Sequence, residues 1–268
     1  MRVSFIGGGV MAEAILAGIL DASLAAPADV RIGEPLELRR AHLRAEYGVA
    51  AVESNADALA GAEMVVLAVK PQGLAGVMAD IRDDLEAGQT VLSIIAGARM
   101  DTLVSGLGHS SVVRVMPNTP AQIGAGMTVW TATEDVPDEN VEASREILRT
   151  LGEEIYVSDE KYIDMATAVS ASGPAYVFLF IEAMIDAGVY LGMPRDISRK
   201  LVLQTVIGSA RLVDESGRHP ADLKDMVTSP GGTTAEALMA FEQGSFRGVV
   251  MDAVSAAYEK SKALGEKS

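Results

Sequence analysis

The sequence predicts an α/β fold in which a doubly wound parallel sheet is followed by a domain made only of helices. Short apolar segments alternate with helical segments through the first half of the chain, a pattern typical of parallel sheets. A glycine-rich turn directly follows the first apolar segment. From about Asp159 onward no strand-like alternation recurs, and helical spacing takes over. We therefore divide the chain into residues 1–158 and residues 159–268.

The first seventeen residues predict a strand at 2–6, a turn of the form G-x-G-x-x-A, and a helix. Gly7 permits the tight turn, Gly9 lets the backbone approach a pyrophosphate, and Ala12 lets the helix pack closely on the strand. The first helical turn also directs N–H groups and a partial positive charge at any ligand placed there. We interpret this segment as the start of a Rossmann-type, dinucleotide-binding domain; an ordinary tight turn is the alternative.

The remaining elements of the first domain follow from apolar runs and helical periods. The expected strands are 30–34, 49–52, 64–69, 90–95, 112–116, 127–131 and 155–157. The expected helices are 36–47, 55–59, 74–85, 100–107 and 140–151. Because ligands of doubly wound sheets bind at the carboxyl ends of the strands, we expect the site there.

The second half contains a helix that is apolar nearly all round. It begins near Gly173-Pro174, with proline suited to the first turn, and its segment 176–184 is interrupted only by Glu182. Such a helix must be covered on most faces, and a partner subunit is the simplest cover. We therefore expect a homodimer formed through an all-helical dimerisation domain; burial within one monomer is the alternative.

Composition excludes several classes of protein. The 268 residues include no cysteine, which removes disulfides, thiolate catalysis and Cys-ligated metals and fits a reducing, cytoplasmic compartment. The net charge of −15 argues against a nucleic-acid partner. We find no leader sequence and no run of about 18 uncharged apolar residues, so we expect no membrane association. His42, His109 and His219 fit no metal-ligand spacing, and we expect no metal.

A second glycine-containing loop, 229–234, precedes another helix. It offers several N–H groups, two hydroxyls and a helix N-terminus, which together make an anion site without Lys or Arg. Thr233 and Glu236 have the spacing of a capping box, so an ordinary capped helix is the alternative. A third loop, Pro117-Asn118-Thr119-Pro120, is either a floor for the cofactor ring or simply a rigid connection.

Five motifs occur in the order and spacing of one enzyme family, and they extend over the whole chain. They are Phe5-Ile6-Gly7-Gly8-Gly9, Leu67-Ala68-Val69-Lys70-Pro71-Gln72, Met116-Pro117-Asn118-Thr119-Pro120, Ser172-Gly173-Pro174-Ala175-Tyr176 and Ser229-Pro230-Gly231-Gly232-Thr233-Thr234. The first is generic to dinucleotide binders, whereas the last two together are specific. The chain resembles the pyrroline-5-carboxylate reductases. The resemblance implies reduction of the cyclic imine L-1-pyrroline-5-carboxylate to L-proline, the last step of proline biosynthesis, by dimers that sometimes gather into larger rings.

The resemblance also implies a set of binding residues. Those for the cofactor are Ile6, Gly7, Gly8, Gly9, Val10 and Met11 at the pyrophosphate, Asn55 at the ribose, and Ala68, Val69, Lys70, Pro71, Ile94, Ile95 and Ala96 at the nicotinamide. Those for the substrate carboxylate and ring are Ser229, Gly231, Gly232, Thr233 and Thr234. The bottom-up argument agrees, since a helix N-terminus without cations is suited to a carboxylate.

The choice between NADH and NADPH stays open at the sequence level. Glu34 lies about 20 residues beyond Ala12, where an acidic side chain binds a ribose 2′-OH and repels a 2′-phosphate. That argument favours NADH. The family more often prefers NADPH, and Arg39 or Arg40 would reach the phosphate if Glu34 turned away.

The expected chemistry is hydride transfer to C5 of the imine while Thr234 orients the ring nitrogen. We assign Lys70 no catalytic role. One rival is a reductase of the β-hydroxyacid dehydrogenase type, but its proton-donating Lys has no counterpart in the helix at 173–192. The other is a silent nucleotide-binding scaffold, which would have lost the loop at 229–234. This mechanism requires the bend at 231–234 to lie within hydride-transfer distance of a nicotinamide whose diphosphate lies on the turn at 7–12. Either protomer of the dimer can contribute each loop.

Overall fold

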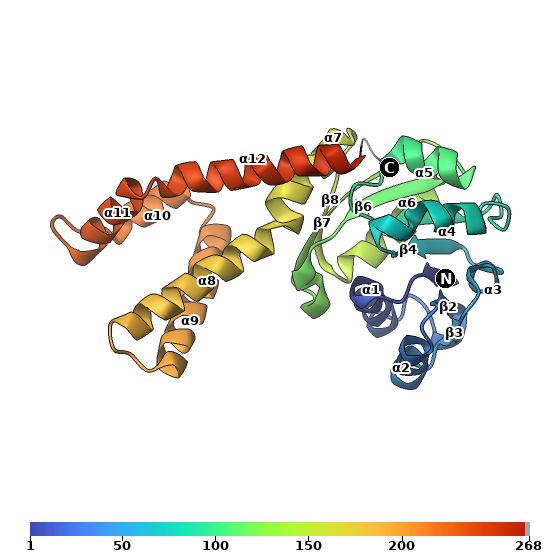
Figure 1. The fold of residues 1–268 in the computed structure, drawn as a ribbon, viewed down its shortest axis with the longest axis horizontal. Coiled ribbons are helices and arrows are strands. Elements are labelled where there is room, and N and C mark those ends of the chain that lie inside the picture. Colours follow the sequence, from blue (N-terminus) through green and yellow to red (C-terminus); the bar gives the residue numbers. More distant parts are fainter. Residues whose placement is uncertain (266–268) are drawn as a thin grey trace. The chain divides into compact units, whose positions relative to one another are not determined.

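The computed structural model describes residues 1–265. It divides into two compact units, one formed by Met1–Ser172 with 257–265 and the other by Gly173–Ala256 (Figure 1). The first unit is thus larger than the segment 1–158, because 159–172 and the end of the chain also pack with the sheet. The division after residue 158 stays a prediction of which residues bind the cofactor and which bind the substrate; the boundaries of the compact units lie elsewhere.

The first unit is built on an eight-stranded sheet of order β3-β2-β1-β4-β5-β6-β7-β8. Its strands are β1 (Val3–Ile6), β2 (Val30–Gly33), β3 (Ala50–Val52), β4 (Met64–Leu67), β5 (Thr90–Ser93), β6 (Val112–Met116), β7 (Gly126–Ala132) and β8 (Gly152–Tyr156). The chain runs outward from β1 to β3, then returns to the centre at β4 and proceeds the other way. This reversal beside β1 is the switch point of a doubly wound sheet.

One strand pair departs from the expected parallel sheet. β7 runs antiparallel to β6, with Arg114 opposite Thr131, whereas every other pair is parallel. The connection 117–125 between them contains only the short 3₁₀ helix η3 (Thr119–Ile123). A parallel return needs a crossover of a dozen or more residues, so this connection turns the chain back antiparallel.

Helices cover both faces of the sheet, because successive strand residues point to opposite sides. Phe5 lies in one apolar cluster, with residues of α1 and α6, and Ile6 lies in the other, with residues of α4 and α5. The helices of this unit are α1 (Val10–Asp21), α2 (Glu37–Tyr47), α3 (Asn55–Leu59), α4 (Leu74–Ile81), α5 (Met100–Leu107), α6 (Asp138–Arg149) and α7 (Lys161–Ala166). A π-helical turn, η4 (Thr167–Ala171), follows α7.

A buried arginine joins distant parts of the first unit. Arg114 on β6 is 1% exposed, and its guanidinium donates to Glu160 (2.5 Å) and to Asp164 (3.1 Å). Asp164 also accepts a hydrogen bond from Ser261 (3.2 Å), near the end of α12 (Phe246–Gly265). The same few side chains therefore hold both α7 and the end of α12 against the sheet.

The second unit is helical throughout, as expected. It contains α8 (Gly173–Tyr190), α9 (Arg195–Ser216), α10 (Pro220–Met226), α11 (Thr233–Gln243) and the first part of α12. α8 and α9 approach closely where Gly188 faces Ser198, whose hydroxyl donates to the carbonyl of Ile185 (2.8 Å). Phe241 packs edge-on against Phe246, joining α11 to α12.

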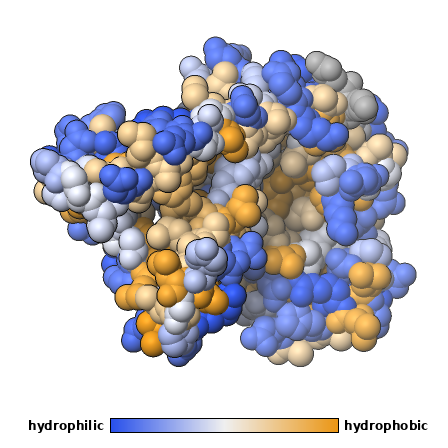
Figure 2. All heavy atoms as spheres, turned by 60° about the vertical axis from the view of Figure 1, so that its left-hand side comes forward, coloured by the Kyte–Doolittle hydropathy of each residue, from blue (hydrophilic) through white to orange (hydrophobic). Residues whose placement is uncertain are grey.

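Apolar side chains remain exposed along these helices. Within the described chain no residue of α8 is buried, although the helix is strongly apolar; Phe178 is 60% and Leu179 66% exposed. Figure 2 shows hydrophobic atoms gathered on the part of the surface that this unit presents. By length and composition alone the helical stretch Lys161–Tyr190 also satisfies the requirements of a membrane span. An apolar helix with its faces uncovered is what the expected subunit partner would cover.

Candidate functional site

The predicted cofactor residues from four strands meet at one edge of the sheet. The last residues of the central strands are in register, Gly33 and Leu67 both pairing with Ile6, and Ser93 with Leu67. The following residues continue the pairing, with Gly7 donating to the carbonyl of Gly33 (2.8 Å) and Ala68 to that of Ile6 (2.9 Å). Ile94 donates to the carbonyl of Leu67 (3.1 Å). The glycine turn, Glu34, Ala68 and Ile94 thus all begin at the carboxyl edge.

The three glycines of the turn have different surroundings. Gly7 has a φ of +97°, and a Cβ there would lie 2.9 Å from the carbonyl oxygen of Ala68. A Cβ on Gly8 would lie 2.7 Å from the side chain of Leu43. Gly9 has an ordinary φ of −70°, and a Cβ there would meet no atom of the described chain within 4 Å. The backbone therefore requires glycine at Gly7, a Cβ on Gly8 would displace the Leu43 side chain, and Gly9 leaves open space in front of the backbone.

That open space adjoins the N-terminus of α1. Gly9 is the N-cap and, having no side chain, cannot satisfy the first N–H groups; the first helical hydrogen bond is donated by Glu13 to the Gly9 carbonyl (2.9 Å). The N–H groups of Val10, Met11 and Ala12 precede that bond and point outward along the helix axis. Open space, backbone donors and the helix dipole together fit a dinucleotide diphosphate.

Glu34 lies beside this turn rather than pointing away from it. Its carboxylate accepts a hydrogen bond from the Gly8 N–H (2.9 Å) and another from the Leu36 N–H (3.0 Å), and the residue is only 8% exposed. The two oxygens are therefore fixed by backbone donors on either side. The sequence predicted the position of this acidic group but could not predict its orientation.

A polar cluster next to the turn was not predicted. Glu13, in the first turn of α1, forms an ion pair with Arg39 and contacts His42 (2.8 Å) and the Tyr47 hydroxyl (3.0 Å). Burial alone would raise the pKa of Glu13, but the hydrogen bonds from His42, Arg39 and Tyr47 together lower it. Burial and then the hydrogen bond to Glu13 raise the pKa of Tyr47 to about 12. The three partners lie 26 to 34 residues beyond Glu13 in the sequence, so no local pattern predicts the cluster.

The remaining predicted cofactor residues lie around the same edge. Asn55 is the first residue of α3; its Oδ1 would be 2.6 Å from a Cβ on Gly33, and its amide donates to Asp80 (2.9 Å). Val69 is half-buried against Gly7, whereas Lys70 is exposed and immediately precedes the 3₁₀ turn η2 (Pro71–Gly73).

The loop after β5 is covered by the end of the chain. Of its residues Ile95 is buried, whereas Ile94 and Ala96 are half-buried. A Cβ on Gly97, which has a φ of +76°, would lie 3.0 Å from the Cβ of Leu264 at the end of α12. The C-terminal turn of α12 therefore packs directly on the loop expected to line the nicotinamide.

The structure favours rigidity as the role of the Pro-bracketed loop. The Asn118 side chain accepts a hydrogen bond from the Met127 N–H (3.0 Å) and donates toward the carbonyl and hydroxyl of Ser170 (both 3.3 Å). These bonds join the start of β7 to the π-helical turn. Asn118 is thus used to connect two segments of the protein.

The predicted substrate loop forms a tight turn in the second unit. Gly231 has a φ of +65°, and the Gly232 N–H donates to the carbonyl of Ser229 (3.0 Å). A Cβ on Gly232 would lie 2.3 Å from the Ser229 hydroxyl. Ser229 and Thr233 are exposed and Thr234 is half-buried. The turn therefore brings the Ser229 hydroxyl to the start of α11.

The structure does not have the capping box that was the alternative interpretation of this loop. α11 begins at Thr233 with Gly232 as its N-cap, so Thr233 and Glu236 lie one position too far into the helix for the reciprocal bonds. Along the described chain no side chain caps this helix, and its first local bond is donated by Ala235 to the Gly232 carbonyl (3.1 Å). The Thr233 and Thr234 N–H groups precede it and are available to an anion.

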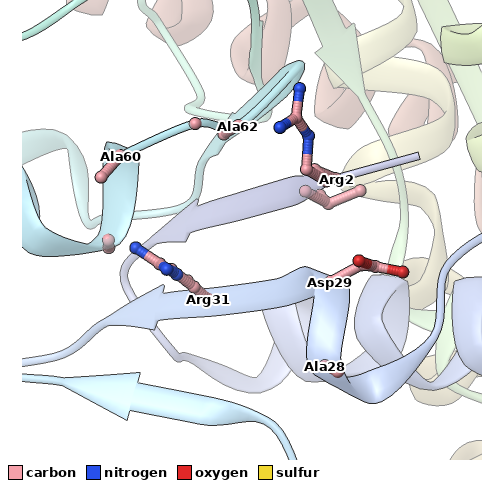
Figure 3. Close-up of a pocket in the computed structure, with 9 residues that line it drawn as sticks. Arg2, Ala28, Asp29, Arg31, Ala60 and Ala62 are labelled. Atoms are coloured by element: carbon pink, nitrogen blue, oxygen red, sulfur yellow. The ribbon is translucent and has the colours of Figure 1, made fainter.

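A separate pocket of about 260 Å³ lies at the opposite, amino edge of the sheet (Figure 3). Its two guanidinium groups are engaged, since Arg2 pairs with Glu63 (3.2 Å) and Arg31 donates to the Asp57 carbonyl (3.2 Å). Ligands of doubly wound sheets bind at the other edge, so this pocket is not the dinucleotide site. Within residues 1–265 no group of three or more His, Asp or Glu is arranged to hold a metal ion.

A glycine turn that opens an uncapped helix beside the switch point of a doubly wound sheet defines a dinucleotide-binding protein. The sequence model described as "NADP oxidoreductase coenzyme F420-dependent" matches residues 2–97, and that described as "Pyrroline-5-carboxylate reductase dimerisation" matches residues 160–264. Relatives named pyrroline-5-carboxylate reductase are 36–43% identical to the chain over at least 95% of both sequences, so the chain belongs to that family. Its helical half is therefore a self-association domain.

Individual relatives agree over the whole length. The chain is 43% identical to pyrroline-5-carboxylate reductase from Synechocystis sp., covering 100% of this chain and 99% of that protein. It is 41% identical to the Escherichia coli reductase, covering 99% and 98%. Among solved structures, the Plasmodium falciparum reductase with NADP bound superposes with a TM-score of 0.90 at 35% identity, covering 99% of this chain and 98% of that one.

Proposed function

We propose that this protein reduces L-1-pyrroline-5-carboxylate to L-proline with NADH or NADPH, the last step of proline biosynthesis. One observation carries the proposal. Two helices, α1 and α11, begin at a glycine N-cap without a side-chain cap among the described residues, and each leaves backbone N–H groups for an anion. The two anionic groups of the reaction, the cofactor diphosphate and the substrate carboxylate, match these two helix ends.

The cofactor-binding residues lie at the carboxyl edge of the sheet. Ile6 and the turn from Gly7 to Met11 would hold the diphosphate, and Asn55 and Glu34 the adenosine ribose. The nicotinamide would be lined by two segments, 68–71 and 94–96. The cofactor supplies a hydride when it is bound. The contribution of these residues is to hold the reacting ring in one position.

The substrate-binding residues lie on the turn before α11. Ser229 and the backbone of Gly231, Gly232 and Thr233 would bind the carboxylate through N–H and hydroxyl donors. Thr234 would hydrogen-bond the ring nitrogen and set which face of C5 is presented. A protonated imine is already electrophilic: the hydride adds to C5, the C=N electron pair moves to nitrogen, and the secondary amine keeps its proton. No further side-chain acid is needed, and Lys70 has no role in this step.

The proposal divides the functions between the two parts of the sequence. Residues 1–158 would bind the dinucleotide, and residues 159–268 would bind the cyclic imino acid and form the homodimer. The exposed apolar surface of α8 supports a dimer, and the dimers would gather further into a ring. The absence of cysteine is compatible with a reducing, cytoplasmic compartment, and the net charge of −15 disfavours a nucleic-acid partner.

Absorbance of the reduced nicotinamide tests the proposed reaction directly. We expect it to fall when the imine is added, and to stay constant with a 2-keto acid; a 3-hydroxy acid should not reduce the oxidised cofactor. Ser229→Ala should raise the KM for the imine, whereas Ser110→Ala, a change of the same kind in the first unit, should leave it unaltered. Turnover of the keto or hydroxy acid in place of the imine would refute the proposal and support the dehydrogenase alternative.

A further inference from the structure

We propose that Glu34 makes this enzyme select NADH over NADPH, an inference that rests on the proposed function. The Glu34 carboxylate is held at the carboxyl end of β2 by the N–H groups of Gly8 (2.9 Å) and Leu36 (3.0 Å). With both bonds in place the side chain cannot swing into solvent without leaving two backbone donors unpaired. The negative charge is therefore a fixed part of the glycine turn.

A fixed carboxylate at this position discriminates between the two cofactors. In doubly wound folds, an acidic side chain at the end of the second strand lies at the 2′ position of the adenosine ribose. A carboxylate oxygen carries several acceptor sites, so Glu34 can accept from a 2′-hydroxyl while keeping its backbone bonds. A 2′-phosphate would instead bring like charges together near a group that is only 8% exposed.

Arg39 is the cation that could offset this repulsion, but its guanidinium is already bound to other groups. Its Nε donates to the carbonyl of Gly8 (2.5 Å), and its Nη2 forms an ion pair with Glu13. The same Glu13 contacts His42. Turning Arg39 toward a phosphate would break both contacts and leave the Glu13 carboxylate without its cation.

Arg40 is still less available, because it is 8% exposed and points inward. Its Nη1 donates to the backbone carbonyls of Glu34 (2.7 Å) and Pro35 (2.8 Å). Its Nη2 lies 2.7 Å from Glu37 and 3.3 Å from Glu53. Arg39 and Arg40 are therefore both matched by carboxylates, and neither is free to pair with a 2′-phosphate.

Direct binding tests this inference without turnover. Titration calorimetry would measure NADH against NADPH, and 5′-AMP against adenosine 2′,5′-bisphosphate. The proteins would be the wild type, Glu34→Gln, Glu34→Ser and Glu46→Gln. The last removes an exposed carboxylate from the same helix, α2. We expect the wild type to bind the member without the 2′-phosphate at least about tenfold more tightly.

The variants separate charge from shape. Glu34→Gln retains an acceptor oxygen and nearly the same volume, so it should keep the turn folded and reduce the preference by about tenfold; Glu34→Ser should act likewise. Glu46→Gln should leave the preference unchanged. A wild type that binds NADPH as well as NADH, or a Glu34→Gln variant that keeps the full preference, would overturn the inference. Either result would leave the proposed imine reduction standing. Conversely, a protein that reduces the imine with neither cofactor would refute the proposed function, but it could still distinguish 5′-AMP from adenosine 2′,5′-bisphosphate.

Discussion

Alanine substitutions at Gly7 and Gly9 should have opposite effects on stability and on cofactor binding. At Gly7 the backbone φ of +97° is strained for alanine, and the new Cβ would lie 2.9 Å from the Ala68 carbonyl oxygen. That carbonyl cannot retreat easily, because the Ala68 N–H is bonded to Ile6 at the edge of the sheet (2.9 Å). Backbone strain and overpacking together predict a loss of about 2 to 5 kcal/mol in the free energy of unfolding. The corresponding fall in Tm is roughly 4 to 20 °C.

At Gly9 the same change should leave the folded protein almost unaffected. The φ of −70° suits alanine, and the new Cβ meets no atom of residues 1–265 within 4 Å. The expected loss in the free energy of unfolding is under about 1 kcal/mol, the difference between glycine and alanine at an N-cap. The methyl group would, however, occupy the space proposed for the diphosphate, and the Kd for NADH should rise by at least about tenfold.

Thermal unfolding and NADH titration of purified Gly7→Ala and Gly9→Ala would check both expectations. Gly76→Ala is the matched control, because a Cβ at this exposed position of α4 also meets nothing within 4 Å of the described chain. It should bind NADH like the wild type. Gly9→Ala with a Kd within twofold of wild type would refute the assignment of the open space to the diphosphate. Gly7→Ala with unchanged Tm would refute the steric argument.

Four further predictions concern other parts of the molecule. Thr234→Ala should lower kcat/KM for the imine by more than about threefold, or about 0.7 kcal/mol, while Thr234→Ser retains most activity; a smaller loss in initial rates would remove Thr234 from the mechanism. Arg114→Met should lower the free energy of unfolding by about 3 kcal/mol because it strands two carboxylates, and urea titration should show partial recovery when Glu160→Gln is added. The folded-state pKa of Glu13 is depressed, so its contribution to stability is complete above about pH 4.5 and is lost as the pH falls further; Glu13→Gln should flatten the dependence of Tm on pH between about 3 and 5. Phe178→Asp should shift the sedimentation coefficient to that of a monomer, and an unchanged dimer would exclude this face of α8 from the interface.

The sequence predicts the elements of the sheet well because burial on both faces leaves a simple signal. Apolar runs between helical segments locate the buried strands, but they carry no information on direction. The exposed strand β8 (Gly152–Tyr156) was expected at 155–157 and overlaps that range at only two residues. The antiparallel course of β7 depends on the short connection 117–125. This connection is too short for a parallel crossover, so its length could have predicted the reversal. Arg114 shows a harder case. Its partners lie 46 and 50 residues away, and an arginine within an apolar run is not recognisable as buried from local pattern.

The gathering of the candidate cofactor residues at one edge was predictable, because chain geometry alone decides it. Parallel strands end at one edge, so residues following β1, β2, β4 and β5 had to gather there. Side-chain orientation was not predictable, because the carboxylate of Glu34 could have faced solvent or the turn. Likewise, glycine can serve as an N-cap without a side chain, so the spacing of Thr233 and Glu236 fitted two helix starts equally. The actual start at Thr233 leaves backbone donors exposed where a capping box would have used them.

The contact between Ser261 and Asp164 has a consequence for the order in which the chain folds. Because the last turn of α12 packs on the β5 loop, the sheet-containing unit is discontinuous in sequence, with the second unit inserted between its parts. The hydrogen bond between Ser261 and Asp164 joins residues 97 positions apart in the sequence. Contacts of such long separation close a large loop and lose more chain entropy than local contacts do. We therefore expect the C-terminal turn of α12 to dock on the β5 loop after the sheet itself has formed.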